Sequence, residues 1–419
     1  MTKFTNWRNM LLTTIICMLT PQICEAQQTR SFSPRIKTVK VEANGEWGVP
    51  PVILKNAGQH FDISFDDLQA SYQRYTYSIT HCNSDWEKSD LLVSEYMTGF
   101  NDQTIDDYEP AIGTEMDYCH YTLTLPNEEN QLLVSGNYRV EIFEDGEDEP
   151  VAQACFSIVE PRVSVSIAVS GNTDIDNYAT HQQVSYSINY SGYQVNNPTS
   201  ELKTVVMQNR RWDNHVEGLQ PSYMQLNKLI FDHQRKLIFP AGNEYRRFEI
   251  LDEYTPTMRV DKMEYSDDYY HATLFVDEQR INYLFDKDQN GRFLVRNGDN
   301  ENNETESDYF YTHFTLSMPQ VAGGDVYLFG DLTDNVIDEA YKMEYDLLDH
   351  QYEISLPLKQ GSYNYMYMFV HDGDAVAQTA QTEGDFHQTE NEYWVYVFHR
   401  PFGERYDKLV GFQTKKSGE

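Results

Sequence analysis

The sequence predicts an all-β protein built from tandem β-sandwich domains of the immunoglobulin, fibronectin or early-set type. Three features predict this fold class. Apolar and polar residues alternate over many short runs, which places successive side chains on opposite faces of a sheet. Clusters of Gly, Asn, Asp and Pro separate these runs, as turns between short strands do. Aromatic residues favour strands, and the chain of 419 residues has 31 Tyr and 21 Phe.

The first 26 residues have the composition of a secretory signal peptide. A short start with Lys3 and Arg8 leads into an apolar run, Met10–Leu19, and ends at the small residue Ala26. A run of about ten residues is far shorter than the roughly twenty that a membrane-spanning helix needs. We therefore expect residues 1–26 to be removed, and we expect no membrane-spanning segment later in the chain.

Residues 27–160 are predicted to form an N-terminal sandwich. Alternation is clearest in four runs, Phe61–Phe65, Tyr75–Ile79, Tyr121–Leu125 and Tyr138–Ile142. Four half-buried strands separated by turn residues are typical of a β-sandwich. Pro161 then interrupts the pattern, because proline cannot donate to the ladder of a central strand.

Residues 161–318 are predicted to form a middle β-rich domain. Alternation resumes in Val163–Val169, in Val184–Tyr190 and in Ile281–Phe285, with less regular sequence between them. The segment Tyr223–Phe231 is predicted as a short helix. The polar run Asn297–Ser307 is predicted as a solvated loop.

Residues 319–419 are predicted to form a C-terminal early-set-like sandwich that begins near Val321. Its clearest strands are Tyr363–Phe369 and Tyr393–Phe398. Some early-set modules bind sugars by stacking them on exposed Trp and Tyr rings. A secreted carbohydrate-binding protein is therefore the alternative function, although no Trp occurs between Val321 and Glu392.

The formal net charge of −34 argues against nucleic acid as a partner. Phosphate backbones are bound mainly through Lys and Arg, and this chain would repel them. The charge is explained by solubility, or by a preference for a basic partner surface or for cations.

Three cysteines follow the predicted signal peptide: Cys82, Cys119 and Cys155. Their spacing fits no zinc pattern of paired ligands. One disulfide at most can form among them. Cys119 and Cys155 could pair if their strands are neighbours, or all three could be buried thiols.

The segment from Asp286 to Gly291 resembles the start of a calcium loop, with oxygen-bearing side chains at Asp286, Asp288 and Asn290. The twelfth position is Asn297, where a bidentate Glu is needed. Asn290-Gly291 between two strand-like runs is also a hairpin-turn signal, and we prefer this interpretation. Calcium is the one cofactor with a candidate site, and no other metal or cofactor is expected.

No catalytic motif is present, and we expect no enzymatic activity. The most suggestive cluster is His81-Cys82, followed by Asn83, Asp85 and Trp86. Adjacent residues of a strand point to opposite faces, so His81 is not placed to act as a base for Cys82. We expect a structural motif in which Asn83 and Asp85 cap a turn and Trp86 closes the sandwich end.

Six segments together resemble the type IX secretion system plug protein family of Bacteroidota. They cover nearly the whole chain after the signal peptide, in order, which makes the resemblance specific. They are Tyr72–Trp86, Ser135–Tyr138, Gln208–Asn214, Gly242–Phe248, Asp288–Phe293 and Leu358–Tyr365. Cys119 departs from the pattern, because the family usually has Thr there.

The resemblance implies a periplasmic subunit at the inner face of the outer membrane. Such a subunit would seat against the periplasmic mouth of the translocon barrel and keep the pore shut without chemistry. Interfaces of this kind have an aromatic or Arg-rich centre. The basic-aromatic clusters of this acidic chain are therefore the candidate contacts: Arg210, Arg211, Trp212, Arg246, Arg247 and Phe248. The alternative interpretation is that Trp212 and Phe248 are buried and the arginines beside them are solvated.

Overall fold

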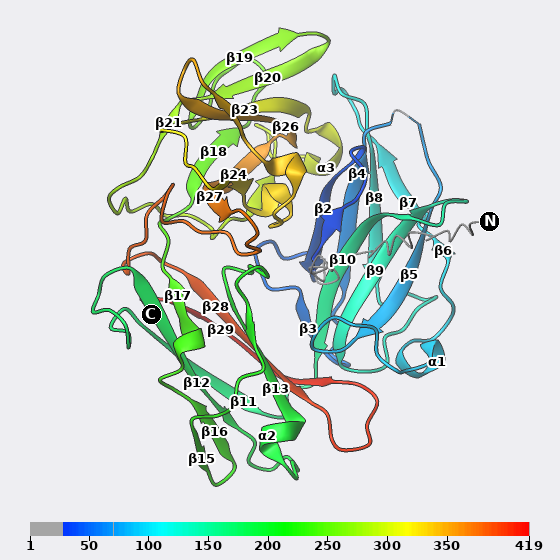
Figure 1. Cartoon of the computed structure of the whole chain (residues 1–419). Helices are drawn as coiled ribbons and strands as arrows, with labels where there is room; N and C mark the ends of the chain where they lie inside the picture. Colours follow the sequence, from blue (N-terminus) through cyan, green and yellow to red (C-terminus); the bar gives the residue numbers. More distant parts are fainter. Residues whose placement is uncertain (1–27, 70, 419) are drawn as a thin grey trace, which may run out of the picture.

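The computed structural model of the chain describes residues 28–69 and 71–418 (Figure 1). The predicted signal peptide and Gln27 lie outside these residues. The described part is all-β, as predicted, and consists of six sheets that pack in pairs as three sandwiches. Helices are limited to single turns.

The first sandwich lies between residues 28 and 160. Its core is filled by alternate residues of both sheets, with Phe61, Ile63 and Phe65 facing Tyr138, Val140 and Ile142. One sheet has the order β2 (Ile36–Ala43), β4 (Phe61–Asp67), β8 (Cys119–Leu125), β7 (Asp107–Pro110). The other has β1 (Arg30–Ser31), β10 (Pro150–Val159), β9 (Gly136–Glu144), β5 (Tyr75–Cys82), β6 (Gln103–Thr104), with β3 (Val52–Leu54) also on β10. The one-turn helix α1 (Val93–Tyr96) follows β5.

The second sandwich combines two distant parts of the chain. One sheet contains β11 (Ser164–Ser170), β12 (His181–Asn189), β16 (Lys228–Phe231), β15 (Tyr223–Gln225) and β17 (Ile238–Pro240). The facing sheet has the order β14 (Val216–Glu217), β13 (Leu202–Gln208), β28 (Glu392–His399), β29 (Lys408–Lys416). The short helices α2 (Pro198–Glu201) and η2 (Arg235–Leu237) lie in its loops.

The third sandwich is inserted between β17 and β28. One sheet contains β18 (Arg246–Ile250), β27 (Gly361–His371), β22 (Phe293–Val295) and β24 (Gly324–Phe329). The other contains β19 (Val260–Ser266), β20 (Tyr269–Leu274), β23 (Tyr309–Ser317), β26 (Gln351–Lys359), β25 (Glu344–Asp346) and β21 (Asp277–Glu278). Its short helices are α3 (Asn303–Glu306), η3 (Asp331–Thr333) and η4 (Glu339–Tyr341).

The strand pairing corrects the expected border between residues 161–318 and 319–419. β23 and β26 lie on either side of that border and pair over nine residues. β28 pairs instead with β13, from Leu202 with His399 to Gln208 with Tyr393. Alternation shows that a segment is a strand, but it does not show which distant strand is its neighbour. The border after residue 160 falls between β10 and β11.

Three local expectations also need correction. Tyr223–Phe231 is not a helix but the β15–β16 hairpin, in which Leu229 and Phe231 face the core. The run Ile281–Phe285 is an irregular exposed segment, so Asn290-Gly291 makes a turn but not a hairpin between two strands. The polar run 297–307 is not wholly solvated, because it contains α3 and its Ser307 is fully buried.

Candidate partner-binding surfaces

The His81–Trp86 motif lies where β5 leaves the first sandwich. His81 is fully buried, and its ring nitrogens lie 2.9 Å from Ser89 Oγ and 3.2 Å from the carbonyl oxygen of Ser135. Cys82 belongs to a different cluster, with Trp86 and Cys155. The two neighbouring side chains thus point to opposite faces of the sheet and do not form a nucleophile and base.

Burial makes His81 a pH-sensitive element of stability. Desolvation by burial lowers the pKa of His81 to about 4, below its ordinary value of 6.5. As the pH falls from 6.5 to 4, the unfolded chain takes up a proton that the folded protein does not. The free energy of unfolding should therefore fall by about 3 kcal/mol over this range. Urea unfolding at several pH values should show that a His81→Gln variant loses this part of the pH dependence.

The turn after Cys82 connects the first sandwich to the second. Asp85 Oδ1 accepts a hydrogen bond of 3.1 Å from the Glu87 N–H, and the Asn83 carbonyl accepts one of 3.0 Å from the Trp86 N–H. Asn83 Oδ1 also accepts from the Asp407 N–H at 3.2 Å. Trp86 packs edge-on against Trp212, with ring centroids 5.9 Å apart. The motif therefore holds two sandwiches together.

The three cysteines are all buried, and no disulfide joins them among the described residues. Cys119 lies on β8 and Cys155 on β10, which belong to different sheets. The two strands are therefore not neighbours, which was the condition for pairing. Desolvation raises the pKa of the Cys155 thiol well above its usual range.

The first basic-aromatic cluster is used mainly inside the molecule. Arg210 forms an ion pair of 2.8 Å with Asp331, and Arg211 forms one of 2.5 Å with Asp213. The Arg211 guanidinium also donates to the Ala377 carbonyl at 2.7 Å. Trp212 is half-buried against the second sandwich. Arg210 and Arg211 therefore join the second sandwich to the third.

The second cluster is internal too, apart from one arginine. Arg246 lies between Asp277 at 2.8 Å and Glu383 at 2.9 Å, and its side chain is only 6% exposed. Phe248 is fully buried in the core of the third sandwich. Arg247 pairs with Asp286 at the surface. Of the six candidate contacts, Arg210, Trp212 and Arg247 keep some exposed surface that a partner could reach, and their role in binding stays a prediction.

Two of the three calcium candidates, Asp286 and Asp288, have other partners in the structure, whereas the buried side-chain amide of Asn290 has none among the described residues. Asp286 pairs with Arg247 at 2.6 Å. Asp288 accepts hydrogen bonds from the backbone N–H groups of Tyr245 and of Asn290, and burial raises the pKa of Asp288 to about 7. Within residues 28–69 and 71–418, no group of three His, Cys, Asp or Glu side chains is placed to hold a metal ion.

The tyrosines on which sugar binding would rest are buried. Tyr363, Tyr365 and Tyr367 of β27 are at most 2% exposed and fill the core of the third sandwich. A sugar ring stacks only on an exposed aromatic face. These residues therefore do not support the alternative of a carbohydrate-binding protein.

A buried charge cluster locks the first sandwich to the third. Lys359 Nζ lies 2.7 Å from Asp66 Oδ2, and both side chains are fully buried. Asp66 also accepts from Tyr309 OH at 2.6 Å and lies 2.6 Å from His120 Nδ1. Burial by itself would raise the pKa of Asp66, but Lys359 and His120 outweigh it and hold this pKa at about 2. Asp66 is therefore ionised at neutral pH.

Further buried pairs join the remaining faces. Asp407 of the second sandwich accepts from Ser84 Oγ of the first at 2.9 Å and pairs with Arg400 at 2.8 Å. Arg292 of the third sandwich pairs with Glu392 of β28 at 2.7 Å. Each pair of sandwiches is thus joined by a hydrogen-bonded carboxylate, which fixes their relative positions.

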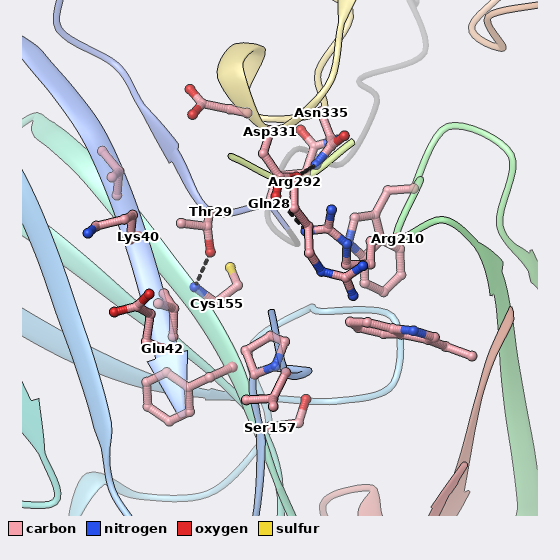
Figure 2. A pocket seen from close by; sticks show the side chains of 18 of the residues that line it. Gln28, Thr29, Lys40, Glu42, Cys155, Ser157, Arg210, Arg292, Asp331 and Asn335 are labelled. Atoms are coloured by element: carbon pink, nitrogen blue, oxygen red, sulfur yellow. Dashed lines mark hydrogen bonds and ion pairs between the residues drawn. The ribbon is translucent and has the colours of Figure 1, made fainter. Parts of the chain in front are cut away.

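A cavity of about 200 Å³ lies where the three sandwiches meet (Figure 2). The first sandwich contributes Glu42 and Ser157, the second contributes Arg210, and the third contributes Arg292 and Asp331. All four Trp residues of the described chain also line it: Trp47, Trp86, Trp212 and Trp394. Of these four, only Trp86 and Trp212 belong to motifs that the sequence brings to notice. The cavity is formed by segments far apart in the chain, so no local sequence pattern indicates it. The small number of Trp residues was the one feature of the sequence that could have directed attention to its lining.

No helix of the described residues is long and apolar enough to cross a membrane. Fold and site together define a multi-sandwich protein whose buried polar groups hold its parts in place. The first sandwich matches the family model of the first domain of type IX secretion system plug proteins, so the chain belongs to this family.

The family model "Type 9 secretion system plug protein 1st domain" matches residues 36–160, which form most of the first sandwich. A crystal structure of a hypothetical protein from Parabacteroides merdae ATCC 43184 is 44% identical, with a TM-score of 0.92. That match covers 93% of this chain and all of the other. The C-terminal domain of the AgI/II polypeptide BspA from Streptococcus agalactiae is 8% identical, with a TM-score of only 0.14 over 90% of this chain and 99% of the other. None of the curated proteins matches.

Proposed function

We propose that the protein is a non-enzymatic periplasmic plug that closes the periplasmic side of the type IX secretion translocon barrel in the outer membrane. Membership of the plug family is the observation that carries this proposal. The locked arrangement of the three sandwiches supports it, because a stopper must resist deformation when its partner moves. A wide water-filled pore leaks unless it is closed, and a rigid body closes it by contact alone.

Deleting the gene in a host with an intact translocon tests the proposal. Loss of the plug is expected to make the outer membrane permeable to vancomycin, which is too bulky for ordinary porins. Growth on vancomycin should then return when the wild-type gene is supplied on a plasmid. Unchanged sensitivity in cells that still contain the translocon would contradict the plug function.

We further propose that an apolar patch at one end of the molecule contacts the barrel. The segments that carry it are those around α1 and the β28–β29 loop, which an ion pair between Arg405 and Glu95 brings together and whose ribbons Figure 1 shows at the same end of the molecule. The patch consists of Leu92, Val93, Leu133 and Phe402, of which Phe402 is fully exposed and Leu92 is 68% exposed. Exposed apolar side chains on segments that are anchored to one another are typical of interaction sites.

A Phe402→Asp variant is expected to reduce co-purification of the barrel with the tagged protein by about tenfold or more. Leu226→Asp is the matched control, since Leu226 is 92% exposed on the distant β15–β16 turn. Both substitutions add one charge to an exposed apolar position, so stability should change little in either. Equal recovery of the barrel with both variants would exclude the patch as the contact.

A further inference from the structure

The cavity at the junction of the three sandwiches has a largely aromatic lining. Its lining contains Trp47, Trp86, Trp212 and Trp394, and these are all the tryptophans in residues 28–69 and 71–418. Flat aromatic faces around a half-open cavity are suited to hold another aromatic or apolar side chain. The first sandwich supplies two of the four, and the second supplies the other two.

Two of these indole groups have buried donors without acceptors. Trp86 is 5% exposed and Trp394 is 3% exposed, yet neither Nε1 has a hydrogen-bond partner within the described residues. Arg210 Nε is unsatisfied as well, and so is Asn335 Oδ1, which is an acceptor. Leaving such groups unpaired costs free energy. A ligand that supplies both carbonyl oxygens and N–H groups would satisfy them.

Two strand edges reach the same cavity. β2 is the last strand of its sheet, and its residues 39–42 line the cavity. The outer edge of β10 pairs with β1 at residues 152–153 and with β3 at residues 157–159, which leaves a gap at residues 154–156. In this gap, the Cys155 N–H donates to Thr29 Oγ1 at 3.0 Å (Figure 2). An open strand edge offers alternating N–H and C=O groups, the pattern that an extended peptide recognises.

The charges around the cavity favour a neutral ligand. Arg210 and Arg292 are already paired with Asp331 and Glu392, at 2.8 Å and 2.7 Å. Lys40 of β2 is paired with Glu304 at 2.6 Å. A phosphate or another strong anion would have to displace these carboxylates, since each of the three cations has its own partner.

We propose that this cavity binds an extended, uncharged peptide segment of a partner protein, with an aromatic side chain placed among the tryptophans. The peptide backbone pairs with the open edge of β2 and supplies acceptors to the two indole N–H groups. A glycan also offers donors and acceptors, but its units do not repeat with the spacing of a strand edge. The proposal concerns peptide binding itself and does not depend on closure of the barrel.

The probe is the capped peptide acetyl-Thr-Val-Phe-Val-Thr-amide, titrated into the mature protein while tryptophan emission is recorded. We expect a saturable change in emission, because every tryptophan of the mature protein lines the cavity. Replacing Phe in the peptide with Ala should weaken binding by about tenfold or more, since the anchor is lost. Methylating the peptide N–H groups of both Val residues should abolish binding, because strand pairing needs these donors.

Variants of the protein test whether the peptide binds in the cavity. Trp394→Phe and Trp86→Phe keep an aromatic ring but remove an N–H donor, so calorimetry should show about fivefold weaker binding in each. Tyr223→Phe removes a hydroxyl from an exposed aromatic outside the cavity and should leave the affinity unchanged. Absence of saturable binding, equal affinity for the N-methylated peptide, unchanged affinity in both Trp variants, or a response to maltohexaose in place of the peptide would each overturn the proposal.

Discussion

Replacing Lys359 with Met is expected to lower the free energy of unfolding by about 3 to 5 kcal/mol. The ammonium group of Lys359 lies 2.7 Å from Asp66, and both side chains are fully buried between the first and third sandwiches. Without this cation, an ionised carboxylate remains buried with only neutral donors and His120 beside it. Such a loss exceeds that of most single substitutions. Urea unfolding at pH 7 measures it.

The matched control is Lys262→Met, which removes a cation from an exposed pair. Lys262 and Glu264 lie 2.5 Å apart on β19, but their side chains are 58% and 50% exposed. Surface pairs of this kind contribute about 0 to 1 kcal/mol. A double variant, Lys359→Met with Asp66→Asn, should recover part of the loss because no buried charge is left unpaired. Equal effects of Lys359→Met and Lys262→Met would contradict the role given to this cluster.

The position of Asp66 shows why the sequence predicts the sandwiches but not their junction. Phe61, Ile63 and Phe65 alternate with Asp62, Ser64 and Asp66, so the sequence correctly indicates a strand with one apolar face. By the same rule, Asp66 belongs to the solvent side. Asp66 is nevertheless fully buried, because the third sandwich covers that face and brings Lys359 to it. Lys359 is 293 positions away from Asp66 in the sequence, so the residues around Asp66 give no indication of this partner.

The basic-aromatic clusters likewise have partners that the local sequence does not predict. Arg210, Arg211 and Arg246 stand out in an acidic sequence, and exposure on a binding surface was one explanation. In the folded protein, each of these arginines forms ion pairs with carboxylates instead. Arg210 pairs with Asp331, Arg211 pairs with Asp213, and Arg246 pairs with Asp277 and Glu383. The insertion of the third sandwich, which brings these groups together, depends on the pairing of β28 with β13. That pairing is non-local, so alternation alone could not predict it.

Arg246→Met is the second substitution for which a large loss of stability is expected, about 3 to 5 kcal/mol. It would leave Asp277 and Glu383, at 1% and 0% exposure of their side chains, without their closest buried cation. Arg259, which is 45% exposed, would still lie 2.6 Å from Asp277, and Arg280 would lie 3.6 Å from Glu383. Neither takes the position between the two carboxylates that Arg246 occupies, and the hydroxyl groups of Tyr365 and Tyr367 are neutral donors to Asp277, at 2.6 Å and 2.9 Å. Thermal and urea unfolding should show the loss, and raising the salt concentration should not reproduce it, because buried pairs are screened little.

Arg247→Met is the control that separates stability from partner binding. Arg247 is the next residue on β18, but its side chain is 34% exposed and pairs with a half-exposed Asp286. Its loss should change the free energy of unfolding by less than about 1 kcal/mol.

If Arg247 also contacts the barrel, recovery of the barrel in pull-downs should fall for Arg247→Met, while the free energy of unfolding stays near that of the wild type. For Arg246→Met we expect the opposite: the free energy of unfolding should fall, whereas in a pull-down at low temperature the fraction that remains folded should still recover the barrel. A stable Arg246→Met protein that fails to bind would show that the arginine faces the partner and not the core.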